Sequence, residues 1–250
     1  MFNAALVESP ALGWQGLGGG KNLSLGKLQL ARVSGLFALA VLAAGCTPKP
    51  KPPPGVTPTV SVGEPLKSET WKAVATAADE DRINRLGLAW QDALADGRKN
   101  FANDIRNEGV LLRPRAALPR PAPTPGSYNC RLIKLGKATA KGPALEKFKP
   151  FFCYVEVDGD LLTIVKQTGS QRPAGRLWED DDPTRLVFLG SLALGAQDQP
   201  LAYGDNPKRD MAGVLERIGP FRWRLVIPWP QSTSKLDVFE LTPVALQPQA

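Results

Sequence analysis

Hydrophobic residues recur at helical spacing in the segment between residues 68 and 113. Intervals of three and four residues, typical of an amphipathic helix, separate Ile83, Leu86, Trp90, Ala93 and Leu94. Thr76-x-x-Asp79 has the form of a capping box and predicts where this helix begins, and Gly97 predicts its end. Residues 101–109 predict a shorter second helix, so we expect a helical hairpin with two unequal arms.

From residue 127 the hydrophobic period changes to two, as in strands with one buried face. Runs of this kind predict strands at 129–135, 151–158, 161–167, 174–178, 185–194, 211–218, 221–227 and 235–241. Short connections, such as Gly-Asp at 159–160 and Gly-Pro at 219–220, favour hairpins between neighbours. We therefore predict an α+β fold, a helical hairpin followed by an antiparallel meander of about eight strands. Closure into a small barrel would remove exposed edges. A half-open barrel, or a sheet capped by the helices, fits nearly as well.

The first 45 residues have the pattern of an export signal. An apolar stretch at 33–44 follows three basic residues, Lys21, Lys27 and Arg32. This stretch is short for a permanent transmembrane helix and has the length of a signal-peptide core. We expect residues 1–45 to be a signal peptide that is removed.

Cys46 directly follows the small residues at 43–45. The arrangement resembles a bacterial lipobox, although Leu42 lies one place earlier than in the commonest form. It implies that Cys46 becomes the first residue and is acylated, with palmitate among the expected fatty acids. A plain signal peptide is the alternative. Because Thr47, and not an aspartate, follows the cysteine, we expect the outer membrane of the cell envelope, with the protein on the periplasmic side.

Two segments contain too much proline to form helices or central strands. Residues 47–67 hold seven prolines and no aromatic residue, so 46–67 is expected to be an extended tether. The second segment lies at 114–126 and separates a helical part, 68–113, from a β part, 127–243. We expect these two parts to form one globular domain, 68–243, followed by a flexible tail at 244–250.

The absence of histidine from all 250 residues excludes several kinds of chemistry. Ser-His and Cys-His nucleophile pairs are impossible, and the commonest transition-metal ligand is missing. The net charge of +7 is spread along the chain and forms no dense basic stripe, so nucleic acid is not an expected partner. We expect no cofactor and no metal, and we favour a protein that is not an enzyme.

Cys130 and Cys153 fall in the first two predicted strands. In an oxidising periplasm, with Cys46 used for lipid, these two are each other's available partners. A disulfide is therefore expected, and two buried free thiols are the alternative.

Two charged clusters are candidate sites. Four acidic residues run from Glu179 to Asp182, but consecutive side chains diverge, which favours a solvated hairpin tip over a calcium site. A second cluster combines Asp205 and Lys208 with Arg209 and Asp210. Paired carboxylates serve acid–base catalysis when they are buried together, whereas salt bridging in a turn is the simpler interpretation.

Several residues of the predicted β part are candidates for ligand or partner contact. They are Gln171, Arg172, Tyr203, Arg209 and Asp210. Arg172 can offer its guanidinium to a carboxylate or phosphate, or can hold its own loop by bonding backbone carbonyls. Alternation at 222–227 predicts an apolar inner face and a cationic outer face, and Tyr203, Trp178 and Trp229 either line a barrel mouth or fill it.

Several motifs resemble those of the domain of unknown function 4893 family. They are Trp90 and the blocks TGSQRPAG, LALG, PLAYG, RDMAGVLERIGPFRWRLVIPWP and LDVFELTP, within a region from about Trp71 to Pro243. The resemblance implies a bacterial envelope protein with a single shared domain and no assigned activity. It implies no catalytic residue.

Three functional hypotheses follow. The first is a lipid-anchored periplasmic module that binds a small ligand or an envelope protein. The second is a cell-envelope enzyme that uses Asp205, Asp210 and Arg172. The third is an inhibitor of a secreted hydrolase, presented on the loop at 169–175. An enclosed cavity with convergent polar groups would favour the first.

Overall fold

The computed structural model describes residues 66–169, 171–195, 198–231 and 234–245. The predicted signal peptide, Cys46, nearly all of the predicted tether and the end of the predicted tail lie outside these ranges.

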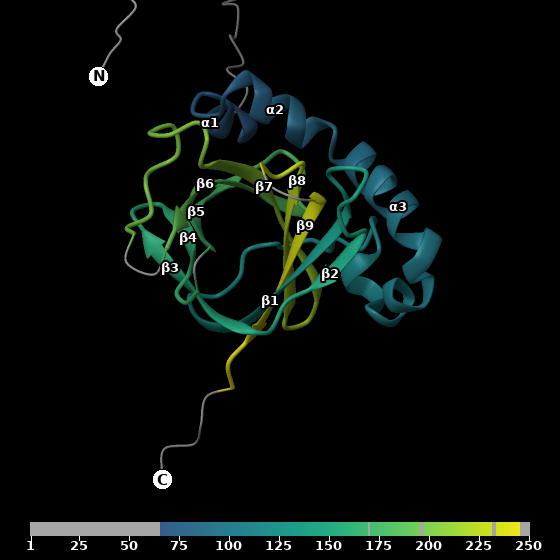
Figure 1. Cartoon of the computed structure of the whole chain (residues 1–250). Coiled ribbons are helices and arrows are strands. Elements are labelled where there is room, and N and C mark those ends of the chain that lie inside the picture. The colour runs from purple at the N-terminus through teal and green to yellow at the C-terminus, as the bar shows by residue number, and fades with distance from the viewer. Residues whose placement is uncertain (1–65, 170, 196–197, 232–233, 246–250) are drawn as a thin grey trace, which may run out of the picture. The chain divides into compact units, whose positions relative to one another are not determined.

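Eight antiparallel strands form a closed ring, and a ninth short strand is added to it. The strands are β1 (Gly126–Lys137), β2 (Leu145–Lys147), β3 (Phe151–Asp158), β4 (Leu161–Lys166), β5 (Gln171–Glu179), β6 (Arg185–Leu194), β7 (Asp210–Gly219), β8 (Arg222–Pro228) and β9 (Ser234–Pro243). From β3 onward each strand pairs with the next along the chain, and β1 pairs with β3. The pairing of β1 with β9, from Tyr128–Pro243 to Lys137–Ser234, closes the barrel seen along its axis in Figure 1.

The sequence predicts all eight strands of the ring, within a few residues at their ends, and the closed barrel is confirmed over the half-open form. The short strand β2 was missed. Its three residues pair with β1 at Ile133–Leu135. The strand β3 pairs with the same edge of β1, but nearer the start of β1, at Gly126–Cys130. A run of three residues is too short to show a period of two.

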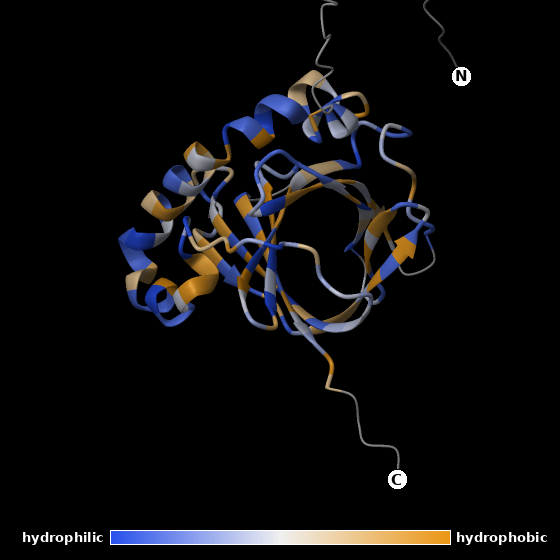
Figure 2. Ribbon diagram, turned by 180° about the vertical axis from the view of Figure 1, so that it is seen from behind, coloured by the Kyte–Doolittle hydropathy of each residue, from blue (hydrophilic) through white to orange (hydrophobic). Residues whose placement is uncertain are grey.

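The barrel has two hydrophobic cores because both faces of its wall are buried where the helices cover it. Inward positions such as Phe188 and Leu225 pack inside the ring, and outward positions such as Val187 and Val226 pack under the helices. Figure 2 shows hydrophobic residues both in the barrel strands and in the helices beside them. Near the β5–β6 contact Gly175 and Gly190 lie opposite each other on the inner face, which lets the two backbones approach closely.

The helices follow one side of the outer wall. They are α1 (Ser68–Lys72), α2 (Ala77–Asn84), α3 (Leu86–Asn107) and the 3₁₀ helix η1 (Gly109–Leu112). Figure 1 shows them as an arc that leaves the outer faces of β3 and β4 uncovered. Within the described ranges, no helix has both the length and the apolar character needed to cross a membrane.

The predicted helix start is confirmed, and the predicted helix end is wrong. Thr76 caps α2, and its hydroxyl accepts a hydrogen bond from the Asp79 amide at 3.2 Å. The helix divides at Arg85, and α3 then runs through Gly97. A Cβ at Gly97 would lie 2.8 Å from Ile105 and 2.9 Å from Leu135, so this glycine serves close packing, not termination. The expected shorter helix is the part of α3 beyond a kink at residue 101.

On the outward face of β8, the cationic side chain of Arg224 is buried under the helices and does not reach solvent. Arg224 is 1% exposed. Its guanidinium donates to Glu216 at 2.6 Å and to the carbonyls of Leu111 and Arg113 at 2.8 and 2.7 Å, and it lies 4.8 Å from the Trp90 ring centroid. A buried arginine satisfied in this way joins η1 and α3 to the barrel wall.

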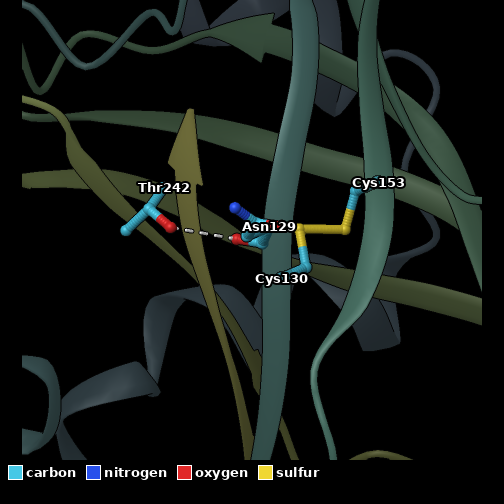
Figure 3. Close-up of a disulfide and its surroundings, with 4 residues drawn as sticks. All are labelled: Asn129, Cys130, Cys153 and Thr242. Carbon is cyan, nitrogen blue, oxygen red and sulfur yellow. Dashed lines mark hydrogen bonds between the residues drawn. A yellow bond between two sulfur atoms is a disulfide. The ribbon is translucent and has the colours of Figure 1, made fainter. Parts of the chain in front are cut away.

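The cysteine pair in β1 and β3 is positioned as predicted. The sulfur atoms of Cys130 and Cys153 lie 2.06 Å apart, which is a disulfide bond between neighbouring strands (Figure 3). On the other side of β1, the Thr242 hydroxyl donates to the Asn129 carbonyl at 3.3 Å. The bridge lies inside the barrel, among buried apolar residues.

Candidate functional site

The two ends of the barrel differ in the length of their connections. Connections after β1, β4, β6 and β8 lie at one end, and those after β3, β5 and β7 at the other, because successive strands alternate in direction. The first set includes the long segment 195–209, and we call this the open end. The second set is short, and we call this the closed end. A proline-rich segment crosses the ring there in Figures 1 and 2, and Trp223 donates to its Pro121 carbonyl at 2.9 Å.

A cavity of about 980 Å³ occupies the open half of the barrel. This volume is at the upper end of the range for small-molecule sites. The apolar wall of the cavity consists of Leu132, Leu192, Met211 and Ile227. The cavity floor consists of Phe151, Lys166, Pro173 and Phe239, which also border a void of only about 10 Å³ beneath them. The barrel is therefore hollow above this floor and packed below it.

A lysine–aspartate pair is buried in the wall of the cavity. Lys134 and Asp237 lie opposite each other on β1 and β9, and their charged groups are 3.7 Å apart. Both are less than a tenth exposed. Burial raises the pKa of Asp237 above its ordinary value, although Lys134 and the Ser234 hydroxyl, which donates to the carboxylate, act in the opposite direction. Glu146 of β2 lies across from Lys134 on its other side.

Lys166 places a second ammonium group in the cavity. Its Nζ lies 4.2 Å from the centroid of the Phe151 ring. Burial lowers the pKa of Lys166, and the positive charge of Lys134 lowers it further. Among the described residues, no Asp or Glu forms an ion pair with Lys166. Phe151 supplies a cation–π contact, which is a weaker partner than a carboxylate.

The cavity lining as a whole is cationic. Six basic side chains face three carboxylates, and two of the basic ones, Arg82 and Arg209, also pair with Asp79 and Asp198 outside the lining, which leaves a smaller excess of positive charge. The basic residues are Arg82, Lys134, Lys149, Lys166, Lys208 and Arg209, and the acidic ones are Glu146, Asp210 and Asp237. A low-dielectric pocket with such an excess attracts anions.

The candidate contact residues are only partly brought together. Gln171, Arg209 and Asp210 line the cavity. Arg172 does not, because its guanidinium donates to the carbonyls of Gly195 and Asp198 and holds the β6–β7 connection. Tyr203 packs against the helices outside the barrel, as do Trp178 and Trp229, so none of these aromatic residues forms the barrel mouth.

Tyr203 belongs to a polar cluster between α2 and the barrel, and Asp210, which also lines the cavity, lies at its edge. The Tyr203 hydroxyl donates to Asp79, which also pairs with Arg82. Asp210 is 4% exposed; one carboxylate oxygen accepts from the Gly204 amide, and the other has no hydrogen-bond partner among the described residues. Burial raises the pKa of Asp210, and the negative charges of Asp79 and Asp205 add to this increase.

The acidic run at 179–182 docks α1 and is not a free hairpin tip. Asp180 accepts from the Trp71 indole at 3.4 Å and from Arg185 at 2.5 Å, and Asp181 accepts from the Ser68 amide at 3.4 Å. The solvated tip expected for Asp180 is therefore wrong. Across the described part of the chain, no group of three or more Cys, Asp or Glu side chains is arranged to hold a metal ion.

The match to a protein-family model decides how the chain is classified. Residues 71–241 match the model described as a domain of unknown function, DUF4893. The chain belongs to this family. The match spans α2, α3, η1 and nearly all of the barrel, so the DUF4893 domain includes both the cavity and most of the elements that cover the outer wall. Searches of curated proteins and of solved structures return no significant match.

The residues that shape the cavity chemistry were missed by sequence reasoning. Lys134, Lys166 and Asp237 lie at the same phase as the inward residues of their strands, and each is the inward residue nearest the open end or close to it. A charge at an inward position is a recognisable signal of a polar group inside a barrel. It was overlooked because each such residue stands beside apolar neighbours that themselves point outward.

Proposed function

We propose that this DUF4893 protein is a binding module of the bacterial cell envelope, and that a small molecule in the barrel cavity is its ligand. The cavity of about 980 Å³ carries this proposal. It combines an apolar wall with a small number of charged groups that point inward, which is the usual composition of a ligand site. The packed closed end leaves the open end as the route of entry.

The leader pattern supports the envelope location. Acylation of Cys46 would hold the domain at the membrane, with the proline-rich segment as a spacer, and the outer membrane is the proposed destination. The Cys130–Cys153 bridge suits an oxidising compartment. Metabolic labelling with palmitate tests this part: the wild-type chain incorporates label and Cys46→Ala does not. Equal labelling of both would contradict acylation at Cys46.

The other two hypotheses gain no specific support from the geometry. The enzyme hypothesis required Arg172 to act beside Asp205 and Asp210, but Arg172 bonds backbone carbonyls and does not line the cavity. The inhibitor hypothesis required 169–175 to be a presented loop, but residues from Gln171 onward form β5.

Native mass spectrometry of the full chain released from its own membrane tests ligand binding. We expect a bound species of small-molecule mass on the wild type and on Val165→Trp, which changes the outer face of β4. Leu192→Trp fills the cavity from its wall and should remove that species. If all three proteins carry no ligand, or if Leu192→Trp retains it, the cavity is not the binding site.

A further inference from the structure

We infer that the ligand is an amphipathic monoanion, with its anionic group on the Lys166 ammonium and its alkyl part against the apolar wall. This inference rests on the proposed function and adds the chemical class of the ligand. The location of one cation without a carboxylate partner among the described residues, beside the apolar wall of the cavity, carries it.

Two lysines at inward positions of the barrel strands line the cavity, Lys134 and Lys166, and they differ in their partners among the described residues. Lys134 is engaged by Asp237, its direct cross-strand neighbour. Lys166 has the Phe151 ring beside it and, in the described ranges, no carboxylate to pair with. One ammonium without a counterion calls for one negative charge from the ligand.

The position of Lys166 makes a ligand anion more effective there than at the surface. Its side chain is half-buried and lines the cavity beside the Phe151 ring, at the last residue of β4. An ion pair in such a site is less screened by water and salt than a pair at the protein surface. Desolvation already lowers the pKa of Lys166, and an anion bound beside it would restore a favourable environment for the charged form.

The charge of the whole lining argues against a cationic ligand, and the wall argues against a purely polar one. Six basic groups surround the cavity, and those near the entrance, such as Lys208 and Lys149, favour the approach of anions. Leu132 and Ile227 in the apolar wall are less than a tenth exposed to solvent. Affinity is therefore expected to rise about fourfold for each methylene that the ligand adds against this wall.

Three eight-carbon probes that differ only in the head group test the inference. Octanoate, octan-1-ol and octylamine are titrated calorimetrically into the full acylated chain in phospholipid nanodiscs, and titrations of empty nanodiscs are subtracted. We expect octanoate to bind roughly tenfold to a hundredfold more tightly than octan-1-ol. Octylamine should bind most weakly.

Two variants compare the half-buried Lys166 with an exposed lysine of the cavity lining. Lys166→Met keeps the length and the apolar stem of the side chain but removes its charge, and it should reduce octanoate affinity by roughly tenfold to a hundredfold while leaving octan-1-ol unchanged. Lys208→Met removes an exposed cation at the entrance and should change octanoate affinity by no more than about threefold. Lys166→Gln provides a second uncharged variant if Lys166→Met alters folding, which circular dichroism monitors.

The outcomes distinguish this inference from the proposed function. If octanoate and octan-1-ol bind equally, or if Lys166→Met and Lys166→Gln retain full octanoate affinity, the monoanion inference is overturned while a cavity ligand of another class stands. If no probe binds and the Leu192→Trp test also finds no cavity ligand, both proposals fail together.

Discussion

At the residue scale, the buried charges differ in how completely their polar atoms are satisfied. Arg224 has a carboxylate, backbone carbonyls and an indole ring around it. Asp210 has a hydrogen bond on one oxygen and none on the other among the described residues. A buried charged group that is half satisfied costs folding free energy, whereas a fully bonded one fixes the position of its neighbours.

We expect Asp210→Asn to stabilise the protein by about 1 kcal/mol at pH 7. The pKa of Asp210 is raised above its ordinary value of 3.8, so the folded state binds a proton more tightly than the unfolded state. Stability from this group is therefore greatest at low pH and falls as the pH rises from below 4 through the folded-state pKa. The asparagine keeps the acceptor for the Gly204 amide and carries no charge. Urea unfolding at pH 7 and at low pH measures the difference, which should shrink as the pH falls.

Asp205→Asn is the matched control, because Asp205 is exposed and its loss should change the unfolding free energy little. A destabilised Asp210→Asn at pH 7 would show that the unbonded oxygen has a cationic partner that the described residues do not include.

At the element scale, inward glycines allow the short strands to curve into a ring. Gly175 and Gly190 face each other across β5 and β6, and Gly213 follows on β7. A Cβ at Gly190 would lie 2.2 Å from the Ala174 carbonyl oxygen, and one at Gly213 would lie 2.3 Å from the Val226 carbonyl oxygen. Backbone atoms cannot yield as side chains do, so these positions constrain barrel curvature.

Gly190→Ala should therefore lower the free energy of unfolding by about 2 kcal/mol or more, since it forces β5 and β6 apart. Gly87→Ala is the control: Gly87 lies in α3, and a methyl group added there would have nothing within 4 Å, so alanine should stabilise by about 0.5–1 kcal/mol. Chemical denaturation of the two variants gives opposite signs. A neutral Gly190→Ala would mean that the wall tolerates a wider strand spacing.

Strands and helix starts were predictable from sequence because they depend on local pattern. The period of two located all eight strands of the ring, and Thr76 located the start of α2. Errors arose where tertiary packing overrides a local preference. From sequence alone Gly97 predicts a helix end. In the structure it lies within α3, where the Leu135 side chain of β1 occupies the space that a Cβ would fill.

The candidate site was predicted less well than the strands. Both faces of the barrel wall are buried, and the sequence of one strand does not show which of its residues face the cavity and which face the helices. Gln171, Arg209 and Asp210 do line the cavity, whereas Lys134 and Lys166 were not considered. Whether an outward residue meets solvent or a helix depends on where the helical arc passes. The burial of Arg224 under α3 therefore required the three-dimensional arrangement.

At the scale of the whole molecule, the helices and the barrel share one wall. The outward side chains of β1, β6, β7, β8 and β9 form a single core with residues of the helices, and their inward neighbours form the other core. The two cores are thus opposite faces of the same strands. Loss of either core exposes the backbone that supports the other, which favours cooperative unfolding.

We expect Leu94→Ala, a change in α3, to lower the stability of the barrel itself. Leu94 is 3% exposed, and the truncation should cost about 2–5 kcal/mol. Native-state hydrogen exchange should show the loss in the amides of β8 and β9 as well as in α3, because the two regions unfold together. Protection lost in α3 alone would show that the helices detach while the barrel stays folded.

The pairing of β1 with β9 has a consequence for the time course of folding. The other pairings of the ring join strands that are close along the chain, but this one brings together residues about one hundred positions apart. Contacts of such long range form late, since chain entropy opposes them until the intervening strands are in place. Until that step β9 is an open edge able to pair with another molecule, so the yield of refolded protein should fall as its concentration rises.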